Sequence, residues 1–565
     1  MITLLLIIPL IGCLCLIPIK ETEVRDLSLR GADLRREGSL LQKKMESLRR
    51  TDVSIEEDRG VWKEIEMTEH FAKQHREYEI KANKIKMKQI ALFASLLNLF
   101  IAIIIWIKFD SSTSQYQFVE GFGWSSLDQG SLSFFNEVSN LSYLENSLPV
   151  LQFYVGIDGI SLYFVLLTAF ITPVCILSNW GEGDINNKLK YYLISFLVLE
   201  TLQIGVFVVL DLLLFYIFFE SVLIPLFLII GIWGAGYSRI RASFLLFLYT
   251  LFGSLWMLLA IMVIYYNYGS TDMQLISLKE ISLDSQKWLW LAFFISFAFK
   301  TPLFPFHIWL GWAHSSAPLG GSIILASVIL KLATYGYLRI LLPIFPDATH
   351  YFSPLVQTIA IITLIYASLA TIRQVDLKGI VAMSSIAHMS VVVLGIFSNT
   401  IQGIEGALLL SLAHGFVSPA LFICVGGILY NRYHTRIINY YRGMALTMPV
   451  FTLMFFLFTL ANMSTPLTLN WIGEFLSLAG IFQRNPVIGA IGATGIFFSA
   501  VYSIWMYNRI SYGKFSIYYP VTTDINRREF MLLLTLLIPT IVFGLFPNLI
   551  LNTVNLSVSS IIYFT

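Results

Sequence analysis

The sequence has few charged residues and few cysteines for its length. Only 13% of its 565 residues are Asp, Glu, Lys or Arg, whereas about a quarter of residues are charged in a typical soluble domain. The four cysteines, Cys13, Cys15, Cys175 and Cys424, lie in apolar runs and form no Cys-x-x-Cys pair. We therefore expect no disulfide framework, zinc site or iron–sulfur cluster, and we interpret the cysteines as small buried hydrophobic residues.

Other functional signals are also absent. The net charge is only +2 and no basic stripe accompanies an aromatic platform, which argues against a nucleic-acid partner. There is no Gly-rich phosphate-binding loop for a nucleotide cofactor. The N-terminus lacks a basic region and a small-residue cleavage site, so the apolar run at 2–18 is interpreted as a retained membrane span and not as a removed signal.

The charges that are present are concentrated in one segment. Residues 20–88 carry 17 Lys and Arg and 15 Asp and Glu, which leaves 20 basic and 20 acidic residues for the other 496. Outside this segment the apolar runs are too long for the core of a soluble domain. The pattern predicts a polytopic membrane protein with one soluble-looking insert.

The apolar runs predict the number of membrane helices. A transmembrane helix needs about 20 mostly apolar residues, and the sequence holds fourteen such runs. The sixth, eleventh and twelfth runs are long, so we expect tilt, breaks or re-entrant backbone there. The predicted spans are 2–18, 90–108, 156–179, 189–210, 212–232, 241–267, 288–310, 319–343, 351–371, 377–398, 402–430, 447–478, 485–510 and 529–551.

Lys and Arg lie mainly on one side of the predicted membrane. We call the side reached after the first span side A and the opposite side side B; side A carries 30 of these residues and side B carries 5. Without the insert the counts are still 13 against 5. By the positive-inside rule, side A is expected to be the cytoplasm or the mitochondrial matrix, with both termini on the other side. The two remaining basic residues, Lys300 and Lys331, fall inside predicted spans.

The starts of the spans repeat along the chain. The fourth to eighth spans begin near 189, 212, 241, 288 and 319, and the ninth to thirteenth begin about 164 residues later. Because each unit has an odd number of helices, the second copy enters the membrane in the opposite sense, which gives an inverted-topology repeat. Proline interrupts the seventh span at 301–303 and the twelfth at 465–467, so both helices are predicted to be broken. The alternative is a chance coincidence of span lengths with two ordinary proline kinks.

The spans and the repeat together predict how the chain is organised. The parts are a first transmembrane helix at 1–19, a charged helical insert at 20–88, transmembrane helices 2 and 3 with a loop at 89–188, a first repeat at 189–343, a second repeat at 351–510, and a final transmembrane helix within 511–565.

Some ionisable residues lie inside predicted spans, where a charge costs at least about 2.5 kcal/mol. Acidic, lysine and histidine groups whose proton affinities depend on one another suit a proton relay. The alternatives are static ion pairs for the charged residues and interhelical hydrogen bonds for the histidines. Two of the acids, Glu200 and Asp211, lie near predicted span ends, where we expect interfacial solvation. The full set is Glu200, Asp211, Glu220, Lys300, His307, Lys331, His388, His414 and Glu474, with Gln203 and Asn462 as uncharged companions.

The insert at 20–88 is predicted to be a helical hairpin on side A. It contains no proline and has many helix formers of mixed charge, and Leu41, Met45 and Leu48 form an apolar stripe. Ser54 and Glu57 fit a capping box that begins the second helix. The hairpin either docks against a neighbouring or peripheral subunit, or is a solvated and partly disordered extension without an essential role.

Several long motifs lie in order between about residue 150 and the C-terminus. They are FFESVLIPLFLIIGIWG (218–234), FAFKTPLFPFHIWL (297–310), AHSSAPLGGSIILASVILKLATYGYLR (313–339), SSIAHMS (384–390), IQGIEGALLLSLAHGFVSPALF (401–422), NRYHTR (431–436) and WIGEFL (471–476). Together they resemble the proton-pumping, antiporter-like membrane subunits of respiratory complex I. The run at 433–436 is similar to one member of that family in particular.

The resemblance implies an all-α fold of about fourteen transmembrane helices with two inverted five-helix repeats, helices 4–8 and 9–13, as the spacing suggests independently. It implies that proton movement from side A to side B is coupled to electron transfer from NADH to ubiquinone elsewhere in the complex. The chain itself would hold no redox centre, and flavin and iron–sulfur clusters would lie in partner subunits. The implied proton carriers are Glu220 and Lys300 as the carboxylate–lysine pair, Lys331 as the central lysine, His388 and His414 in the connecting water chain, and Glu474 as the exit carboxylate.

The resemblance also implies partners and a location. The expected partners are other complex I membrane-arm subunits, including two paralogous antiporter-like subunits, and the lipid bilayer. The expected location is the mitochondrial inner membrane with both termini on the intermembrane-space side, and a bacterial plasma membrane is the alternative. Two other functions stay open: a stand-alone cation/proton antiporter subunit, and a structural scaffold whose buried charges only hold helices together.

Three features depart from the family pattern. Residues 310–314 lack the proline and the acidic residue expected before Ala-His, and residues 466–469 lack the expected glycine-containing turn. The insert at 20–88 is not a standard part of such subunits. None of these departures involves an implied proton carrier.

Overall fold

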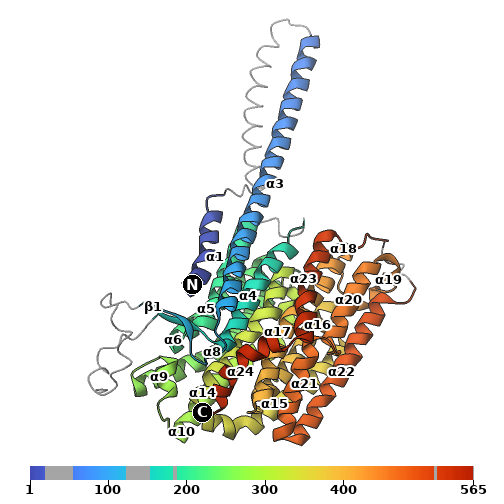
Figure 1. The fold of residues 1–565 in the computed structure, drawn as a ribbon. Helices are drawn as coiled ribbons and strands as arrows, with labels where there is room; N and C mark the ends of the chain where they lie inside the picture. Colours follow the sequence, from blue (N-terminus) through green and yellow to red (C-terminus); the bar gives the residue numbers. More distant parts are fainter. Residues whose placement is uncertain (20–54, 123–152, 182–187, 515–517, 519, 564–565) are drawn as a thin grey trace.

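Apolar runs of membrane-spanning length become the long helices of a bundle in the computed structural model, which describes residues 1–19, 55–122, 153–181, 188–514, 518 and 520–563 (Figure 1). Eleven helices in these ranges are long and apolar enough to cross a membrane, and α1 and α20 are shorter apolar helices. The first-half elements are α1 (Ile2–Leu16), α3 (Ile55–Lys108), β1 (Gln117–Phe122), β2 (Phe153–Ile157), α4 (Gly159–Ser178), α5 (Leu189–Val208), α6 (Leu212–Ser221), α7 (Leu223–Trp233), α8 (Arg239–Tyr268), α9 (Met273–Ser277), α10 (Leu283–Lys300) and α11 (Ile308–Ser316).

The second half continues the same alternation of helices. Each predicted span overlaps one helix or consecutive helices, and the prediction of an all-α polytopic membrane fold is confirmed. The elements are α12 (Leu319–Ile324), η3 (Leu325–Ile329), α13 (Leu330–Gly336), η4 (Tyr337–Leu341), α14 (Leu342–Ile344), α15 (Pro346–Arg373), α16 (Leu377–Ile396), α17 (Ile401–Phe422), η5 (Ile423–Leu429), α18 (Tyr430–Tyr433), η6 (Ile438–Tyr440), α19 (Met444–Thr447), α20 (Pro449–Asn462), α21 (Leu469–Arg484), α22 (Pro486–Ser511), α23 (Arg527–Leu545) and α24 (Asn548–Tyr563).

Both helices with a predicted break are discontinuous. α10 ends at Lys300 and α11 begins at Ile308, on either side of Pro302. α20 ends at Asn462 and α21 begins at Leu469, on either side of Pro466. Proline has no N–H to donate and disturbs the preceding turn, so the chain leaves the helix at both places. Lys300 is the last residue before the first break, and Glu474 lies in the helix that follows the second break.

Wider helical turns interrupt the eighth and eleventh spans. The π-helical turns η3 and η4 flank α13, and η5 continues α17. π turns shift the backbone hydrogen bonds by one residue and are common at functional sites. Lys331, the second residue of α13, therefore sits directly after such a turn.

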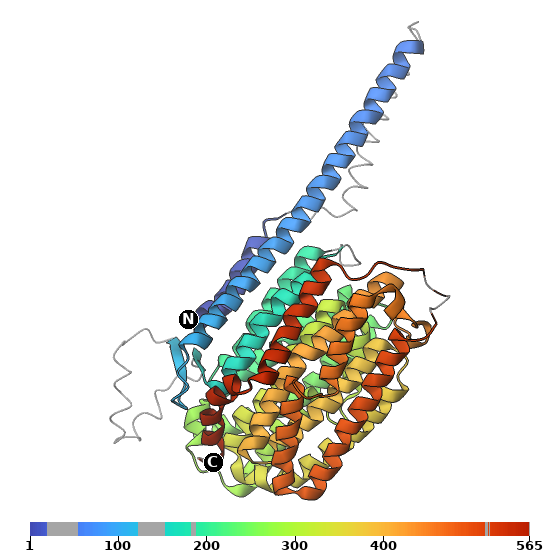
Figure 2. The same cartoon turned by 45° about the vertical axis from the view of Figure 1, so that its right-hand side comes forward.

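The insert differs from the prediction in one respect. The second helix of the predicted hairpin and the second membrane span are a single helix, α3, of 54 residues. It projects well beyond the bundle (Figures 1 and 2). No proline or glycine-containing turn separates the charged part from the apolar part, so the helix continues across the change in composition. The first helix of the hairpin and Ser54 of the capping box lie outside the described residues.

Two features differ from the predicted spans: a pair of strands, β1 and β2, and an additional helix, α24. β1 and β2 form an antiparallel pair, and Glu120 of β1 accepts hydrogen bonds from the Met1 amino group and, at 3.0 Å, from the Thr3 N–H. α24, which begins at Asn548 near the end of the last predicted span, packs against α4 and α17. Tyr163 of α4 donates to the Leu549 carbonyl at 2.9 Å, which fixes one end of this added helix.

The prediction that the cysteines are buried is confirmed for three of the four. Cys15 is exposed, whereas Cys13, Cys175 and Cys424 are buried.

Glycines allow α17 and α21 to approach closely. A Cβ atom added at Gly406 would lie 2.4 Å from the Ser477 backbone nitrogen, and one added at Gly473 would lie 2.5 Å from the Leu410 backbone nitrogen. Small residues permit this kind of backbone contact between membrane helices. The contact places His414 of α17 and Glu474 of α21 in the same layer of the bundle.

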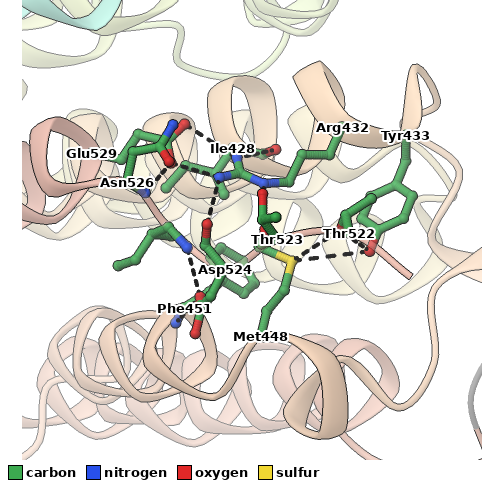
Figure 3. A network of polar contacts seen from close by, with 11 residues as sticks. Ile428, Arg432, Tyr433, Met448, Phe451, Thr522, Thr523, Asp524, Asn526 and Glu529 are labelled. Atoms are coloured by element: carbon green, nitrogen blue, oxygen red, sulfur yellow. Dashed lines mark hydrogen bonds and ion pairs between the residues drawn. The ribbon is translucent and has the colours of Figure 1, made fainter. Parts of the chain in front are cut away.

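An arginine network joins the segment before α23 to the rest of the bundle (Figure 3). Arg432 donates to both carboxylate oxygens of Glu529, at 3.1 and 2.7 Å. It also donates to the carbonyl groups of Thr523 and Asp524, each at 3.1 Å. The Asp524 carboxylate in turn accepts from the backbone N–H of Phe451 at the start of α20, at 3.1 Å. The network therefore connects α18, α20 and α23.

Replacing Arg432 with Met is expected to destabilise this region. The side chains of Arg432 and Glu529 are only 11% and 13% exposed, and removal of one member of a buried ion pair costs about 3–5 kcal/mol. We expect a lower unfolding temperature of the purified complex than for the wild type. Arg442→Met, at an exposed position on the same side, is the control and should leave the temperature unchanged. Equal unfolding temperatures for the two variants would contradict a stabilising role.

Candidate functional site

The first part of the site is formed by Glu220 and Lys300. Lys300, the last residue of α10, is 1% exposed and donates to the Phe219 carbonyl at 2.7 Å. Its Nζ also lies 3.3 Å from the centre of the Phe219 ring. Glu220 interacts electrostatically with Lys300. Both oxygens of Glu220 are buried, so the pair lies away from bulk solvent.

Lys331 occupies the centre of the bundle. It is 0% exposed, and its Nζ lies 2.6 Å from the Ala326 carbonyl oxygen and 2.7 Å from Nδ1 of His414. A neutral imidazole nitrogen accepts a hydrogen bond from an ammonium group, and the same contact allows the proton to move onto the ring. The π turn before Lys331 and the helix α17 position these two groups. The structure thus joins a lysine of the first predicted repeat to a histidine of the second.

The second part of the site continues from His414 to Glu474. The rings of His414 and His388 have their centres 5.9 Å apart. Nδ1 of His388 is 2.8 Å from Oε1 of Glu474, and its Nε2 is 3.5 Å from the Tyr502 hydroxyl. His388 and Glu474 are 2% and 3% exposed. Lys331, His414, His388 and Glu474 therefore form a series of buried acid–base groups in which hydrogen bonds join the first two and the last two, and the two imidazole rings lie near each other without a hydrogen bond among the described residues.

Two buried hydroxyl groups lie near the lysines. Ser296 precedes Lys300 by one turn of α10, and Thr334 follows Lys331 by one turn of α13, and these helices pack together. Among the described residues, neither hydroxyl oxygen has a hydrogen-bond partner. Buried polar groups usually bind protein or water. No hydrogen bond joins Lys300 to Lys331 among the described residues.

Two acidic residues differ from the prediction. Glu200 is 0% exposed in the middle of α5 and accepts a hydrogen bond from Asn98 of α3 at 2.7 Å, so interfacial solvation is wrong for it. Asp211 is 5% exposed and caps α6, accepting from Leu213 N–H at 2.8 Å and from the Thr271 hydroxyl. Both carboxylates lie outside the series from Glu220 to Glu474, since their partners belong to other polar clusters.

The remaining polar candidates also lie outside the series. His307 is 8% exposed and packs between the rings of Phe304 and Tyr366. Asn462 donates to the Ser503 hydroxyl at 3.0 Å, which satisfies an amide at the break after α20. Gln203 is 0% exposed. We therefore assign these residues to packing between helices and not to the acid–base series.

Several buried ionisable groups are missed by reasoning from the sequence. In the sequence, Lys378 is assigned to a loop on side A. In the structure its side chain is only 4% exposed, because Asp376 caps α16 and Lys378 lies in the first turn of that helix. His314, in the motif at 313–339, is 0% exposed. Arg339 is assigned to a side B loop in the sequence. In the structure it forms a buried ion pair with the Asp158 carboxylate, at 3.3 Å. The Asp-x-Lys capping pattern at 376–378 is the sequence signal that could have identified Lys378.

The arrangement suits proton transfer. A buried carboxylate–lysine pair lies near a buried group of one lysine, two histidines and a carboxylate, and a proton on one member of such a group changes the proton affinity of its neighbours. Within the described ranges, no group of three or more His, Cys, Asp and Glu is placed to hold a metal ion.

Comparison with known proteins gives the same family on two independent grounds. The profile of the NADH:quinone oxidoreductase/Mrp antiporter transmembrane family matches residues 210–499. The chain is 64% identical over 478 residues to NADH-ubiquinone oxidoreductase chain 4 of Mycosarcoma maydis, covering 85% of this chain and 94% of that protein. It is 47% identical to the chain 4 protein of Marchantia polymorpha, covering 84% of this chain and 92% of that protein.

Two solved structures have a similar fold. A chain of respiratory complex I from Thermus thermophilus with bound NADH has a TM-score of 0.74 at 25% identity, covering 84% of this chain and 94% of that chain. A chain of the Mrp complex from Dietzia sp. DQ12-45-1b has a TM-score of 0.72 at 16% identity, covering 84% and 92%. The second likeness concerns the fold alone.

Proposed function

Because the chain belongs to the NADH:quinone oxidoreductase/Mrp antiporter family, within the group of NADH-ubiquinone oxidoreductase chain 4 proteins, we propose that it is a proton-translocating membrane-arm subunit of NADH:ubiquinone oxidoreductase. It contributes to that enzyme as a subunit and carries protons, while electron transfer from NADH to ubiquinone occurs elsewhere in the complex. The observation that carries the proposal is the buried series from Lys331 through His414 and His388 to Glu474.

The six proton carriers have distinct roles in this proposal. Glu220 and Lys300 form a charge pair whose separation depends on events in neighbouring subunits. When Lys300 carries a proton without its counter-ion, it disfavours a proton on Lys331, since like charges in a low-dielectric interior repel strongly. Lys331 then passes its proton to His414, and His388 and Glu474 deliver it toward side B.

The proposal includes partners, cofactors and location. The partners are other membrane-arm subunits of the complex, including two paralogous antiporter-like subunits, and lipid. Flavin and iron–sulfur clusters are assigned to partner subunits. The membrane is the mitochondrial inner membrane, with side A as the matrix and both termini on the intermembrane-space side. The excess of Lys and Arg on side A supports this orientation.

We infer that each of the two repeats contributes its own proton carriers. We assign Glu220, Lys300 and Lys331 to the first repeat at 189–343, and His388, His414 and Glu474 to the second at 351–510. The break in α10–α11 lies beside Lys300, and the break in α20–α21 precedes Glu474. Discontinuous helices at corresponding positions are typical of transport sites at the interface between repeats.

Glu220→Gln tests the proposal. Gln keeps the shape of the side chain but cannot hold the negative charge that pairs with Lys300. In assembled complex reconstituted into vesicles, we expect NADH-driven proton transfer to fall about tenfold or more, in the range of effects for lost acid–base groups. Glu280→Gln, at an exposed position, should pump at the wild-type rate.

The experiment also separates the alternatives. Undiminished pumping by Glu220→Gln would favour a scaffold in which buried charges only hold helices together. Purification without flavin and iron–sulfur subunits would favour a stand-alone cation/proton antiporter subunit. The high identity to chain 4 proteins across most of their length favours the complex I subunit.

A further inference from the structure

A cavity lies at the predicted side A surface, where the loop between α7 and α8 connects the two helices. Its volume is about 450 Å³, within the range of small-molecule sites in proteins. Its wall includes Lys188, Ile232, Arg239 and Tyr430. None of the six proposed proton carriers lines it, so the cavity is separate from the acid–base series.

Two basic residues line this cavity without an opposing carboxylate. Arg239 donates from Nη1 to the carbonyl groups of Ile232 at 3.4 Å and Gly234 at 3.3 Å, which holds the guanidinium at the end of α7. Its other two nitrogens have no hydrogen-bond partner among the described residues, and the same is true of the Lys188 ammonium group. No Asp or Glu occurs between residues 221 and 271. The cavity therefore favours an anion.

The other walls of the cavity are formed by glycine backbone and by an aromatic residue. A Cβ atom added at Gly234 would lie 2.2 Å from the Ile230 carbonyl oxygen, and Gly236 has a φ of +80°, so this tight loop requires glycine at both positions. Tyr430, the first residue of α18, lines the cavity from another part of the chain. An ammonium, a guanidinium and a phenol together suit a phosphate group.

Exposed apolar side chains lead away from the cavity along both helices. On each helix they recur every four residues, so they lie on one face. The helices pack against each other, and the rings of Phe227 and Phe244 have their centres 5.2 Å apart. Such a surface at membrane depth suits lipid acyl chains. The exposed residues are Ile224, Leu228 and Ile232 on α7, and Ile240, Phe244 and Leu248 on α8.

We propose that this cavity binds the phosphate of an anionic phospholipid from the side A leaflet, with Lys188 and Arg239 as its cationic groups and with acyl chains along the exposed faces of α7 and α8. Basic pockets between membrane helices on this side of a membrane bind such head groups. A free phosphate ion would not use the apolar faces, and a neutral phospholipid would not balance the two positive charges. The inference goes beyond the proposed function, because it concerns a lipid and not a proton carrier.

Lys188→Gln combined with Arg239→Gln tests the site. The probe is phosphatidylglycerol with a photoreactive acyl chain, present as a small fraction of the lipid in phosphatidylcholine nanodiscs that hold the assembled complex. In the wild type, cross-links should form with peptides of α7 or α8. Each basic residue near an anionic lipid contributes a factor of about five in affinity. We therefore expect the yield of these cross-links to fall about twentyfold or more in the double variant.

Matched controls distinguish the possible occupants. Arg373→Gln combined with Arg442→Gln removes two exposed basic residues on the same side and should give the wild-type yield. Lys188→Arg combined with Arg239→Lys keeps both charges and should give most of it. Unlabelled phosphatidylglycerol should compete with the probe, whereas inorganic phosphate should not. Equal cross-linking in the wild type and the Gln double variant, or displacement of the probe by inorganic phosphate, would overturn the proposal.

A map of the wild-type complex in the same nanodiscs tests the site without any variant. We expect density for a head group between Lys188 and Arg239, continuous with acyl chains along α7 and α8. A side chain or helix of a neighbouring subunit in the cavity would overturn the proposal. Density for an isolated anion without acyl chains would also overturn it.

Discussion

Lys331→Met is expected to lower NADH-driven proton translocation to less than about one-tenth of the wild-type rate, because general acid–base groups contribute factors of this size or larger. Lys331 begins the part of the site that continues to Glu474, through its contact with His414 at 2.7 Å. Met has a similar length and no titratable group, so the series is interrupted at its centre.

The measurement uses complex reconstituted into vesicles, with acidification of the lumen followed after addition of NADH. Lys279→Met, in an exposed side B loop, is the control for loss of a lysine and should behave as the wild type. Proton translocation at the wild-type rate by Lys331→Met would contradict a central role for this residue.

Glu474→Gln should have an effect of similar size. Gln retains a hydrogen-bonding side chain opposite His388, whose Nδ1 is 2.8 Å from the carboxylate. It cannot accept and release a proton, so delivery from His388 toward side B should stop. We expect translocation to fall about tenfold or more, again within the range for lost acid–base groups.

Glu200→Gln provides a closely matched control. Glu200 is as deeply buried as Glu474, and it accepts a hydrogen bond from Asn98 at 2.7 Å. It has no contact with the histidines among the described residues, so its replacement should leave translocation near the wild-type rate. Equal losses in Glu200→Gln and Glu474→Gln would indicate that buried carboxylates act through stability and not through proton transfer.

Much of the fold could be predicted from the sequence because the bilayer imposes simple rules. Apolar runs of sufficient length indicate the spans, and prolines at 302 and 466 indicate the two broken helices. Lysines inside apolar runs are costly to bury in a membrane, which is why Lys300 and Lys331 stand out in the sequence alone. Lys331 contacts His414, and His388 contacts Glu474, so four of the implied carriers lie close together, while their role in proton transfer stays a prediction.

Other features depend on contacts between distant segments and could not be predicted in this way. Glu200 is buried because Asn98, about a hundred residues earlier, packs against it from α3. Lys378 is near a span end in the sequence, yet it bonds to Ala317 of another helix pair and is shielded there. The π turns beside Lys331 also leave no clear pattern in the sequence. Periodicity and local motifs identify a helix, but not which of its polar groups a neighbouring helix covers.

The central claim is that the buried carboxylates change their protonation during turnover. Infrared difference spectroscopy of the working complex measures this directly, since a protonated carboxyl group has a C=O band separate from that of a carboxylate. Turnover with NADH should produce a change in the carboxyl region, part of which disappears in Glu220→Gln and part in Glu474→Gln. Identical difference spectra for the wild type and both variants would mean that these residues form static ion pairs, and would contradict the account.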